Sequence, residues 1–202
     1  MSTSTSVASP AALLQEKIRN HTARVGIVGL GYVGLPLAVE FAQAGFEVVG
    51  IDISQGKVDD LNKGISYIQD IATATLRPLV ESGKLKATTD YSAVADLDTI
   101  NICVPTPLGK TKDPDMSFIM NSAEEIARNF KGTKLILLES TTYPGTTEEV
   151  LLPLLEKSGQ KVGVDFFLCF SPERVDPGNP KYHTKNISLD IARNYEERLG
   201  YK

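Results

Sequence analysis

The sequence predicts an α/β fold, a doubly wound parallel sheet of about six strands with helices on both faces. Two observations lead to this prediction. Short segments that are almost wholly apolar alternate with patterns typical of amphipathic helices. Strands of such continuous apolar character fit a parallel sheet that is buried on both faces. A third observation, a glycine-rich segment at 29–34 between the first strand and its helix, suggests which member of this class the chain forms.

The elements follow in order. A short helix is expected within 11–23, where Leu13, Leu14 and Ile18 have helical spacing. Later helices are expected at 32–44, which Gly45 should end, and at 55–62, 71–82, 120–130 and 147–159, with the 71–82 helix interrupted or reshaped around Pro78. Strands are expected at 24–30, 46–52, 84–90, 99–105, 134–140 and 165–172.

Length and composition favour one ordinary globular domain. The chain has 202 residues, of which 42% are apolar and 23% are charged. A net charge of −4 argues against a general nucleic-acid binder, which needs a basic surface. No segment approaches the ~20 apolar residues of a membrane span, and the polar start lacks the features of a secretory signal. We therefore expect a cytoplasmic protein in which Cys103 and Cys169 are buried thiols.

The glycine-rich segment has the form of a dinucleotide-binding motif. Gly29, Gly31 and Gly34 follow the order G-x-G-x-x-G between a strand and a helix. In this arrangement the first glycine permits a tight turn, the second admits a pyrophosphate and the third lets helix and strand pack closely. The helix N-terminus offers unpaired N–H groups to the phosphates. A glycine turn without a ligand is the alternative interpretation.

Asp52 strengthens the dinucleotide interpretation. It lies 18 residues beyond Gly34, at the end of the second predicted strand. Its carboxylate would accept hydrogen bonds from the adenosine ribose and would repel a 2′-phosphate. The sequence therefore predicts NAD as cofactor in preference to NADP.

Polar residues follow the last three predicted strands, at the edge where such sheets bind ligands. Each of them alone is compatible with an ordinary cap or turn. Together they predict a cleft lined by hydroxyls, a carboxylate and a guanidinium. The residues are Pro105, Thr106 and Pro107 after the fourth strand, Ser140, Thr141 and Thr142 after the fifth, and Glu173, Arg174 and Asp176 after the sixth.

Five motifs resemble the N-terminal domain of the UDP-glucose/GDP-mannose dehydrogenase family. They are "GIVGLGYVGLPLA", "ATTD", "ICVPTPL", "ESTTYPGTT" and "FSPERVDPGN", and they occur in the family's order. "VPTPL" with "SPERVDPGN" is most similar to the branch that acts on UDP-N-acetylglucosamine or UDP-N-acetylmannosamine. The resemblance implies a Rossmann-type domain over 24–187 and oxidation of the sugar C6 alcohol to a carboxylate with two NAD. It also implies a UDP-sugar substrate, no metal ion and a homo-oligomer.

The resemblance assigns roles residue by residue. Thr141 would help to order a catalytic water, Glu173 would act on that water as acid and base, and Arg174 would bind the substrate diphosphate. Asp52 and Lys57 match contacts to the adenosine ribose. The implied cofactor-binding residues are Gly29, Gly31, Tyr32, Val33, Gly34, Asp52, Lys57, Pro105, Thr106, Ser140 and Thr142.

The chain departs from the family after residue 187. The family's nucleophile is a cysteine in a downstream glycine-rich loop, and neither Cys103 nor Cys169 stands in that place. Residues 188–202 match nothing in the family and suggest a short helix capped by Ser188. We therefore expect a truncation, an altered terminus or one piece of a longer enzyme, inactive by itself. The alternatives are a stand-alone NAD-binding or interaction module without catalysis, and a Rossmann dehydrogenase of another type.

Overall fold

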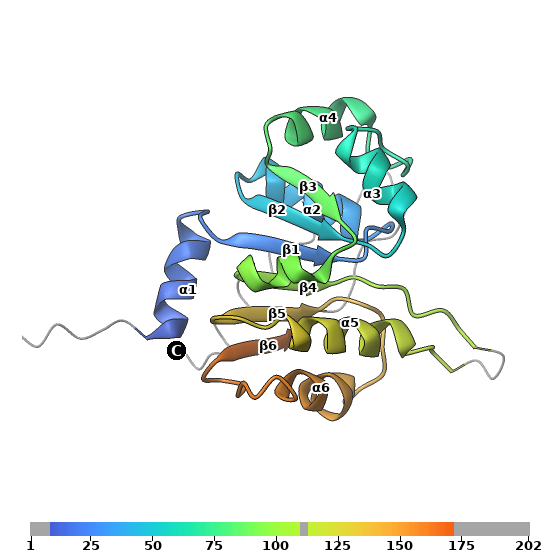
Figure 1. Cartoon of the computed structure of the whole chain (residues 1–202). Coiled ribbons are helices and arrows are strands. Elements are labelled where there is room, and N and C mark those ends of the chain that lie inside the picture. Colours follow the sequence, from blue (N-terminus) through green and yellow to red (C-terminus); the bar gives the residue numbers. More distant parts are fainter. Residues whose placement is uncertain (1–8, 110–112, 172–202) are drawn as a thin grey trace, which may run out of the picture.

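The computed structural model describes residues 9–109 and 113–171, which contain a six-stranded, all-parallel sheet (Figure 1). The strand order is β3-β2-β1-β4-β5-β6, with β3 and β6 at the two edges. This arrangement confirms the predicted fold class. The strands are β1 (Arg24–Val28), β2 (Glu47–Ile51), β3 (Leu85–Thr88), β4 (Thr99–Ile102), β5 (Lys134–Leu138) and β6 (Phe166–Phe170).

The helices lie close to where the sequence predicts them. The α-helices are α1 (Pro10–Arg19), α2 (Gly34–Gln43), α3 (Gln55–Asn62), α4 (Thr73–Glu81), α5 (Ser117–Arg128) and α6 (Leu152–Glu156). One further element was not predicted, the 3₁₀ helix η1 (Tyr91–Asp96), and the helix predicted at 147–159 begins as a π-helical turn η2 (Thr147–Leu151) that leads into α6. Gly45 follows α2 with φ +101°, which explains why the helix ends there.

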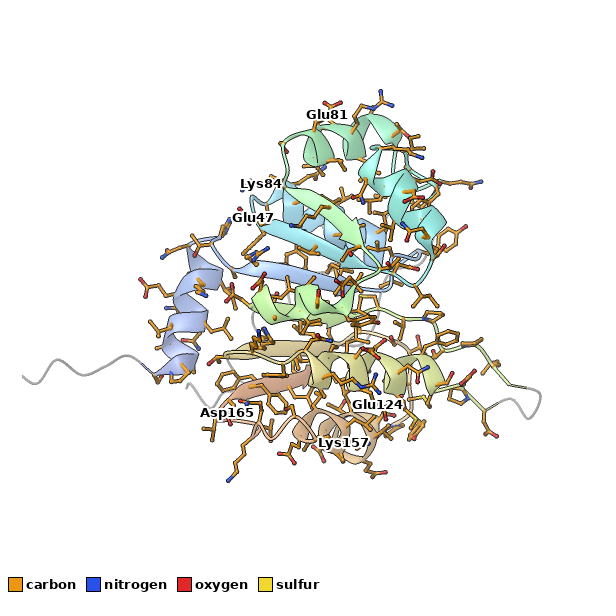
Figure 2. The ribbon with its side chains drawn as sticks, in the orientation of Figure 1. Glu47, Glu81, Lys84, Glu124, Lys157 and Asp165 are labelled. Atoms are coloured by element: carbon orange, nitrogen blue, oxygen red, sulfur yellow. The ribbon has the colours of Figure 1, made fainter. Side chains whose placement is uncertain are left out.

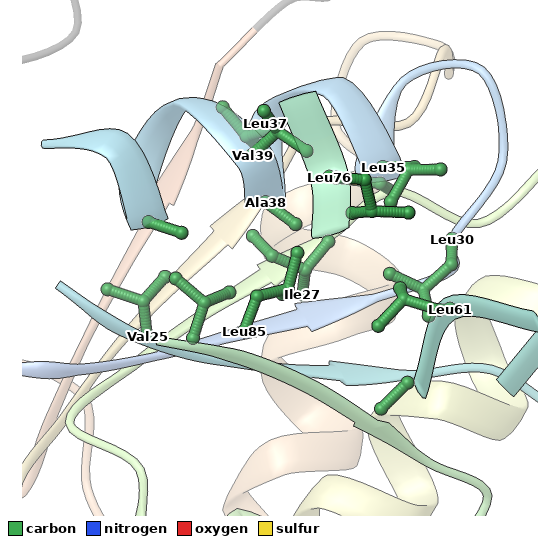
Figure 3. Close-up of a cluster of buried hydrophobic side chains, with 14 of the residues drawn as sticks. Val25, Ile27, Leu30, Leu35, Leu37, Ala38, Val39, Leu61, Leu76 and Leu85 are labelled. Atoms are coloured by element: carbon green, nitrogen blue, oxygen red, sulfur yellow. The ribbon is translucent and has the colours of Figure 1, made fainter. Parts of the chain in front are cut away.

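Two large hydrophobic clusters lie on the two faces of the sheet, and a small third one joins Leu14 of α1 to Leu135 and Leu137 of β5. The first joins the inward sides of α2, α3 and α4 to strand residues such as Val25 and Ile27, and Figure 3 shows its centre. The second joins α5, α6 and η1 to residues such as Val28 and Ile136. Neighbouring strand residues Ile27 and Val28 belong to opposite clusters, as expected for a strand that is buried on both faces.

Two expectations need correction. Helix α4 is not interrupted at Pro78, which lies inside a continuous helix from Thr73 to Glu81. Proline removes one helical hydrogen bond there, but the packing of Leu76, which is fully buried, holds the helix against the core. Cys103 is buried as expected, whereas Cys169 is only half-buried because β6 is an edge strand.

Charged side chains lie around the sheet and between helices (Figure 2). Glu124 of α5 and Lys157, just after α6, are 3.6 Å apart and link these two neighbouring helices. None of the helices within the described residues is long and apolar enough to cross a membrane.

Candidate cofactor-binding site

The glycine turn lies at the centre of the sheet, where the strand order reverses. Gly29 follows β1 with φ +93°, a conformation that favours glycine. A Cβ atom at this position would lie 2.8 Å from the carbonyl oxygen of Cys103, so the turn packs directly against the backbone that follows β4. Ligands of doubly wound sheets bind at this reversal, outside the carboxyl ends of the strands.

The other two glycines have contrasting surroundings. A Cβ on Gly34 would lie 1.8 Å from the carbonyl oxygen of Gly29, so any side chain there would collide with the turn. A Cβ on Gly31 would meet nothing within 4 Å. The fold therefore requires glycine at 34 for packing, whereas position 31 faces open space. Open space beside a bare backbone fits the predicted approach of a pyrophosphate.

Asp52 follows β2 and is fixed against the glycine turn. Its Oδ2 accepts a hydrogen bond from the Leu30 N–H at 2.8 Å, and its Oδ1 accepts one from the Ser54 N–H at 2.9 Å. The Lys57 ammonium is 3.1 Å from Oδ2. A carboxylate offers about four acceptor positions, so one is left for the predicted ribose contact. Lys57 also offsets the negative charge, which weakens the predicted electrostatic exclusion of NADP.

The hydroxyls at the ends of β4 and β5 hold the two loops together. Thr106 donates to the Thr141 carbonyl at 2.7 Å, and Ser140 donates to the Val104 carbonyl at 2.7 Å. Thr142 and Thr146 share a hydrogen bond of 2.5 Å between their hydroxyls. Pro105 and Thr141 are exposed. Among these hydroxyl residues, Thr141 is therefore the one that is exposed to solvent.

Two predicted functional residues, Glu173 and Arg174, lie outside the described residues, as does Asp176. The strand before them, β6, is paired with β5, and the Ser171 N–H donates to the Leu138 carbonyl at 2.9 Å. Within residues 9–109 and 113–171, no three His, Cys, Asp or Glu side chains gather as a metal site would require.

One contact at the turn was missed by sequence reasoning. The Tyr67 hydroxyl donates to the Leu30 carbonyl at 2.9 Å, from the segment between α3 and α4. Burial, with Asp52 and Asp60 adding to it, raises the Tyr67 pKa well above its ordinary value. No motif marks this tyrosine, and the only signal was an aromatic residue within the predicted turn "KGISYIQD".

Comparison with known proteins decides the family. Residues 23–190 match the model of the NAD binding domain of the UDP-glucose/GDP-mannose dehydrogenase family. The chain belongs to this family. Its membership confirms the resemblance described above, and NAD is the cofactor for which this family domain is named.

Two relatives within the family are 37% and 39% identical to the chain over the residues that align. A UDP-N-acetyl-D-glucosamine 6-dehydrogenase of Pseudomonas aeruginosa is 39% identical over 165 residues, which cover 81% of this chain and 38% of the relative. A UDP-N-acetyl-D-mannosamine dehydrogenase of Pyrococcus horikoshii is 37% identical over 156 residues, covering 77% and 37%. The chain thus spans less than two fifths of the length of these relatives.

Solved structures agree with the family fold. A ternary complex of GDP-mannose dehydrogenase from Pseudomonas aeruginosa superposes with a TM-score of 0.75 at 34% identity. The match covers 88% of this chain and 44% of that one. Family, fold class and type of cofactor are thus established, while the roles of single residues stay predictions.

Proposed function

We propose that the chain is the NAD-binding part of a nucleotide-sugar 6-dehydrogenase that oxidises the C6 alcohol of a UDP-N-acetylhexosamine to a carboxylate, in the synthesis of polysaccharide precursors. One observation carries this proposal: the Gly31 backbone faces open space, and the Asp52 carboxylate is held beside the same turn, 2.8 Å from the Leu30 N–H. One side of the turn can admit a diphosphate and the other presents an acceptor to a ribose. The relatives named as UDP-N-acetylhexosamine dehydrogenases support the substrate class.

The residues of the chain would act as follows. Backbone N–H groups at the start of α2, from Gly31 to Gly34 and including Tyr32 and Val33, bind the pyrophosphate. Asp52 accepts from the adenosine ribose, and the Lys57 ammonium, 3.1 Å from Asp52 Oδ2, holds that carboxylate in place. NAD, when bound, supplies the hydride acceptor. Pro105, Thr106, Ser140 and Thr142 shape the loops beside it through the hydrogen bonds between β4 and β5.

Catalysis would start at the same cleft. Loss of a hydride from C6 requires that the alcohol proton leaves at the same time. Thr141 has an exposed side chain at the end of β5 and would hold a water, Glu173 would take the proton through it, and Arg174 would bind the substrate diphosphate. The second oxidation needs a thiolate that carries the aldehyde as a covalent adduct. Cys103 is buried behind the glycine turn and Cys169 lies within strand β6, so we propose that the thiolate comes from outside these 202 residues.

Two measurements on the 202-residue chain test the proposal. Titration calorimetry should show binding of NAD and weaker binding of NADP. An NADH absorbance assay with UDP-N-acetylglucosamine and UDP-N-acetylmannosamine should show no sustained turnover. Equal affinity for the two cofactors would contradict the assignment of Asp52. Robust conversion to the uronic acid would contradict the assignment of the thiolate to residues outside the chain and would point to Cys103 or Cys169. A homo-oligomer and a cytoplasmic location remain predictions, testable by light scattering and by fractionation.

A further inference from the structure

The Leu30 residue of the glycine turn is held on three sides. Its N–H donates to Asp52 at 2.8 Å, and its carbonyl accepts from the Tyr67 hydroxyl at 2.9 Å. Its side chain is fully buried and lies where Gly50 leaves room, since a Cβ on Gly50 would be 2.6 Å from a Leu30 methyl. Figure 3 shows the Leu30 side chain turned into the core beside Leu61.

The carbonyl of Leu30 and the N–H of Gly31 belong to one planar peptide. In a trans peptide these two groups point in opposite directions, and the described residues contain no cis peptide. A hydrogen bond that fixes the direction of the Leu30 carbonyl therefore also fixes the direction of the Gly31 N–H. Glycine would otherwise let this peptide rotate freely, because it has no Cβ to restrict φ and ψ. A Cβ at Gly31 would meet nothing within 4 Å, so no packing restrains it from the other side.

We propose that Tyr67 is a positioning residue of the cofactor site, which aims the Gly31 N–H at the pyrophosphate of the dinucleotide by holding the Leu30 carbonyl. This inference rests on the proposed function. Asp52 fixes the peptide before Leu30 and Tyr67 fixes the peptide after it. Two successive peptides of the turn are thus oriented by side chains from two separate segments, before any ligand arrives.

The segment that carries Tyr67 is itself firmly held. The Ser66 N–H donates to the Thr73 hydroxyl at 3.1 Å, and the Ser66 hydroxyl donates to the Ile68 carbonyl at 3.1 Å. The Tyr67 ring packs against the core cluster of α2, α3 and α4. Because burial and Asp52 raise the Tyr67 pKa, the hydroxyl keeps its proton and stays a donor throughout the physiological range. A fixed donor of this kind is what pre-organisation of a binding turn requires.

The test compares ligands with and without a diphosphate. Tyr67→Phe keeps the ring and its packing and removes only the hydroxyl. In calorimetry, we expect its affinity for NAD and for ADP-ribose to fall about five- to tenfold, the effect of one hydrogen bond. Its affinity for adenosine, followed by NMR titration, should not change, because adenosine lacks the phosphates. Hydrogen exchange of the ligand-free variant should be faster at the Gly31 and Tyr32 amides.

Tyr91→Phe is the matched control. Tyr91 is also half-buried, but its hydroxyl is 3.3 Å from that of Ser122 on α5 instead of donating to the backbone of the glycine turn. We expect this variant to bind NAD and ADP-ribose with unchanged affinity. An equal loss of affinity for all three ligands in Tyr67→Phe, with a lower melting temperature, would show a merely structural role and overturn the inference.

Two other results also decide the matter. If the unmodified chain binds NAD and Tyr67→Phe binds it equally well, the inference fails and the proposed function stands. If the unmodified chain binds no dinucleotide, the proposed function fails and the inference fails with it.

Discussion

The carboxyl ends and the amino ends of the strands are built differently. At the carboxyl ends, the backbone at Gly31 faces open space, and Thr141 is exposed. At the amino ends of the strands, several charged groups have close partners within the protein. Lys17 is 2.6 Å from Asp98, whose other oxygen accepts from the Arg24 N–H at 2.9 Å. Lys134, only 1% exposed, donates to the Leu97 carbonyl at 2.6 Å.

The difference shows how polar groups can mark function or stability in the same fold. A buried polar group that has partners serves the fold, because leaving it unpaired would be costly. A polar group that is held in place but still has an acceptor or donor to spare can serve a ligand. Asp52 is of the second kind and Lys134 is of the first. The variants below separate the two kinds, from the largest expected effect to the smallest.

Gly34→Ala should damage the fold itself. The new Cβ would lie 1.8 Å from the Gly29 carbonyl oxygen, which is backbone and cannot move away cheaply. We expect a loss of about 3 kcal/mol or more in the free energy of unfolding, measured by urea denaturation. Gly56→Ala, within helix α3, is the control, since the nearest atom to the new Cβ would be the Ser54 hydroxyl oxygen at 4.0 Å. This control should be neutral or stabilising by up to about 1 kcal/mol.

Gly31→Val should damage the ligand site and leave the fold intact. Its side chain would enter the space beside the turn, where no protein atom lies within 4 Å of the Cβ. We expect the affinity for NAD to fall by about a hundredfold or more, by exclusion of the pyrophosphate, with a melting temperature close to that of the unmodified chain. Retained affinity would mean that the glycines serve the turn alone.

Lys134, the first residue of β5, should make the free energy of unfolding depend on pH. Burial lowers the Lys134 pKa to about 8, against the opposing effect of Asp98 and Asp96. The unfolded chain then binds more protons than the folded one above this pH, so the free energy of unfolding should rise with pH. Between pH 8 and pH 10, the free energy of unfolding should rise by about 2 kcal/mol more in the unmodified chain than in Lys134→Met, as measured by denaturation at each pH. Parallel curves for the two proteins would contradict this effect of burial.

Asp52→Asn should change the choice of cofactor. The amide oxygen can still accept from the Leu30 N–H, but the charge that Lys57 contacts at 3.1 Å is gone. A released ammonium favours a 2′-phosphate. We expect NAD to bind about tenfold more weakly and the gap between NAD and NADP to narrow, as measured by calorimetry. Asp59→Asn removes the same charge from the exposed side of α3 and should alter neither affinity.

Much of the fold was predictable from local patterns. The apolar runs located all six strands, and helix α3 has the predicted bounds of Gln55 and Asn62. The 3₁₀ helix at Tyr91–Asp96 was missed, because it has no distinctive hydrophobic period. The helix predicted at 147–159 was found, but the sequence did not show that it begins as a π turn at Thr147–Leu151. Pro78 was overestimated as a helix breaker for a related reason. Local propensity predicts an interruption, and the burial of Leu76 overrides it.

The sequence by itself determined the family, the parallel sheet and the three glycines of the turn, because these depend on residue type at fixed spacing along the chain. Only the tertiary structure separated the glycines by role and placed Lys57 against Asp52 and Tyr67 against Leu30. Tyr67 lies 37 residues beyond Leu30, and no local pattern encodes which carbonyl its hydroxyl reaches. Such contacts arise when separate segments pack on one core, so the support of the glycine turn became visible only in three dimensions.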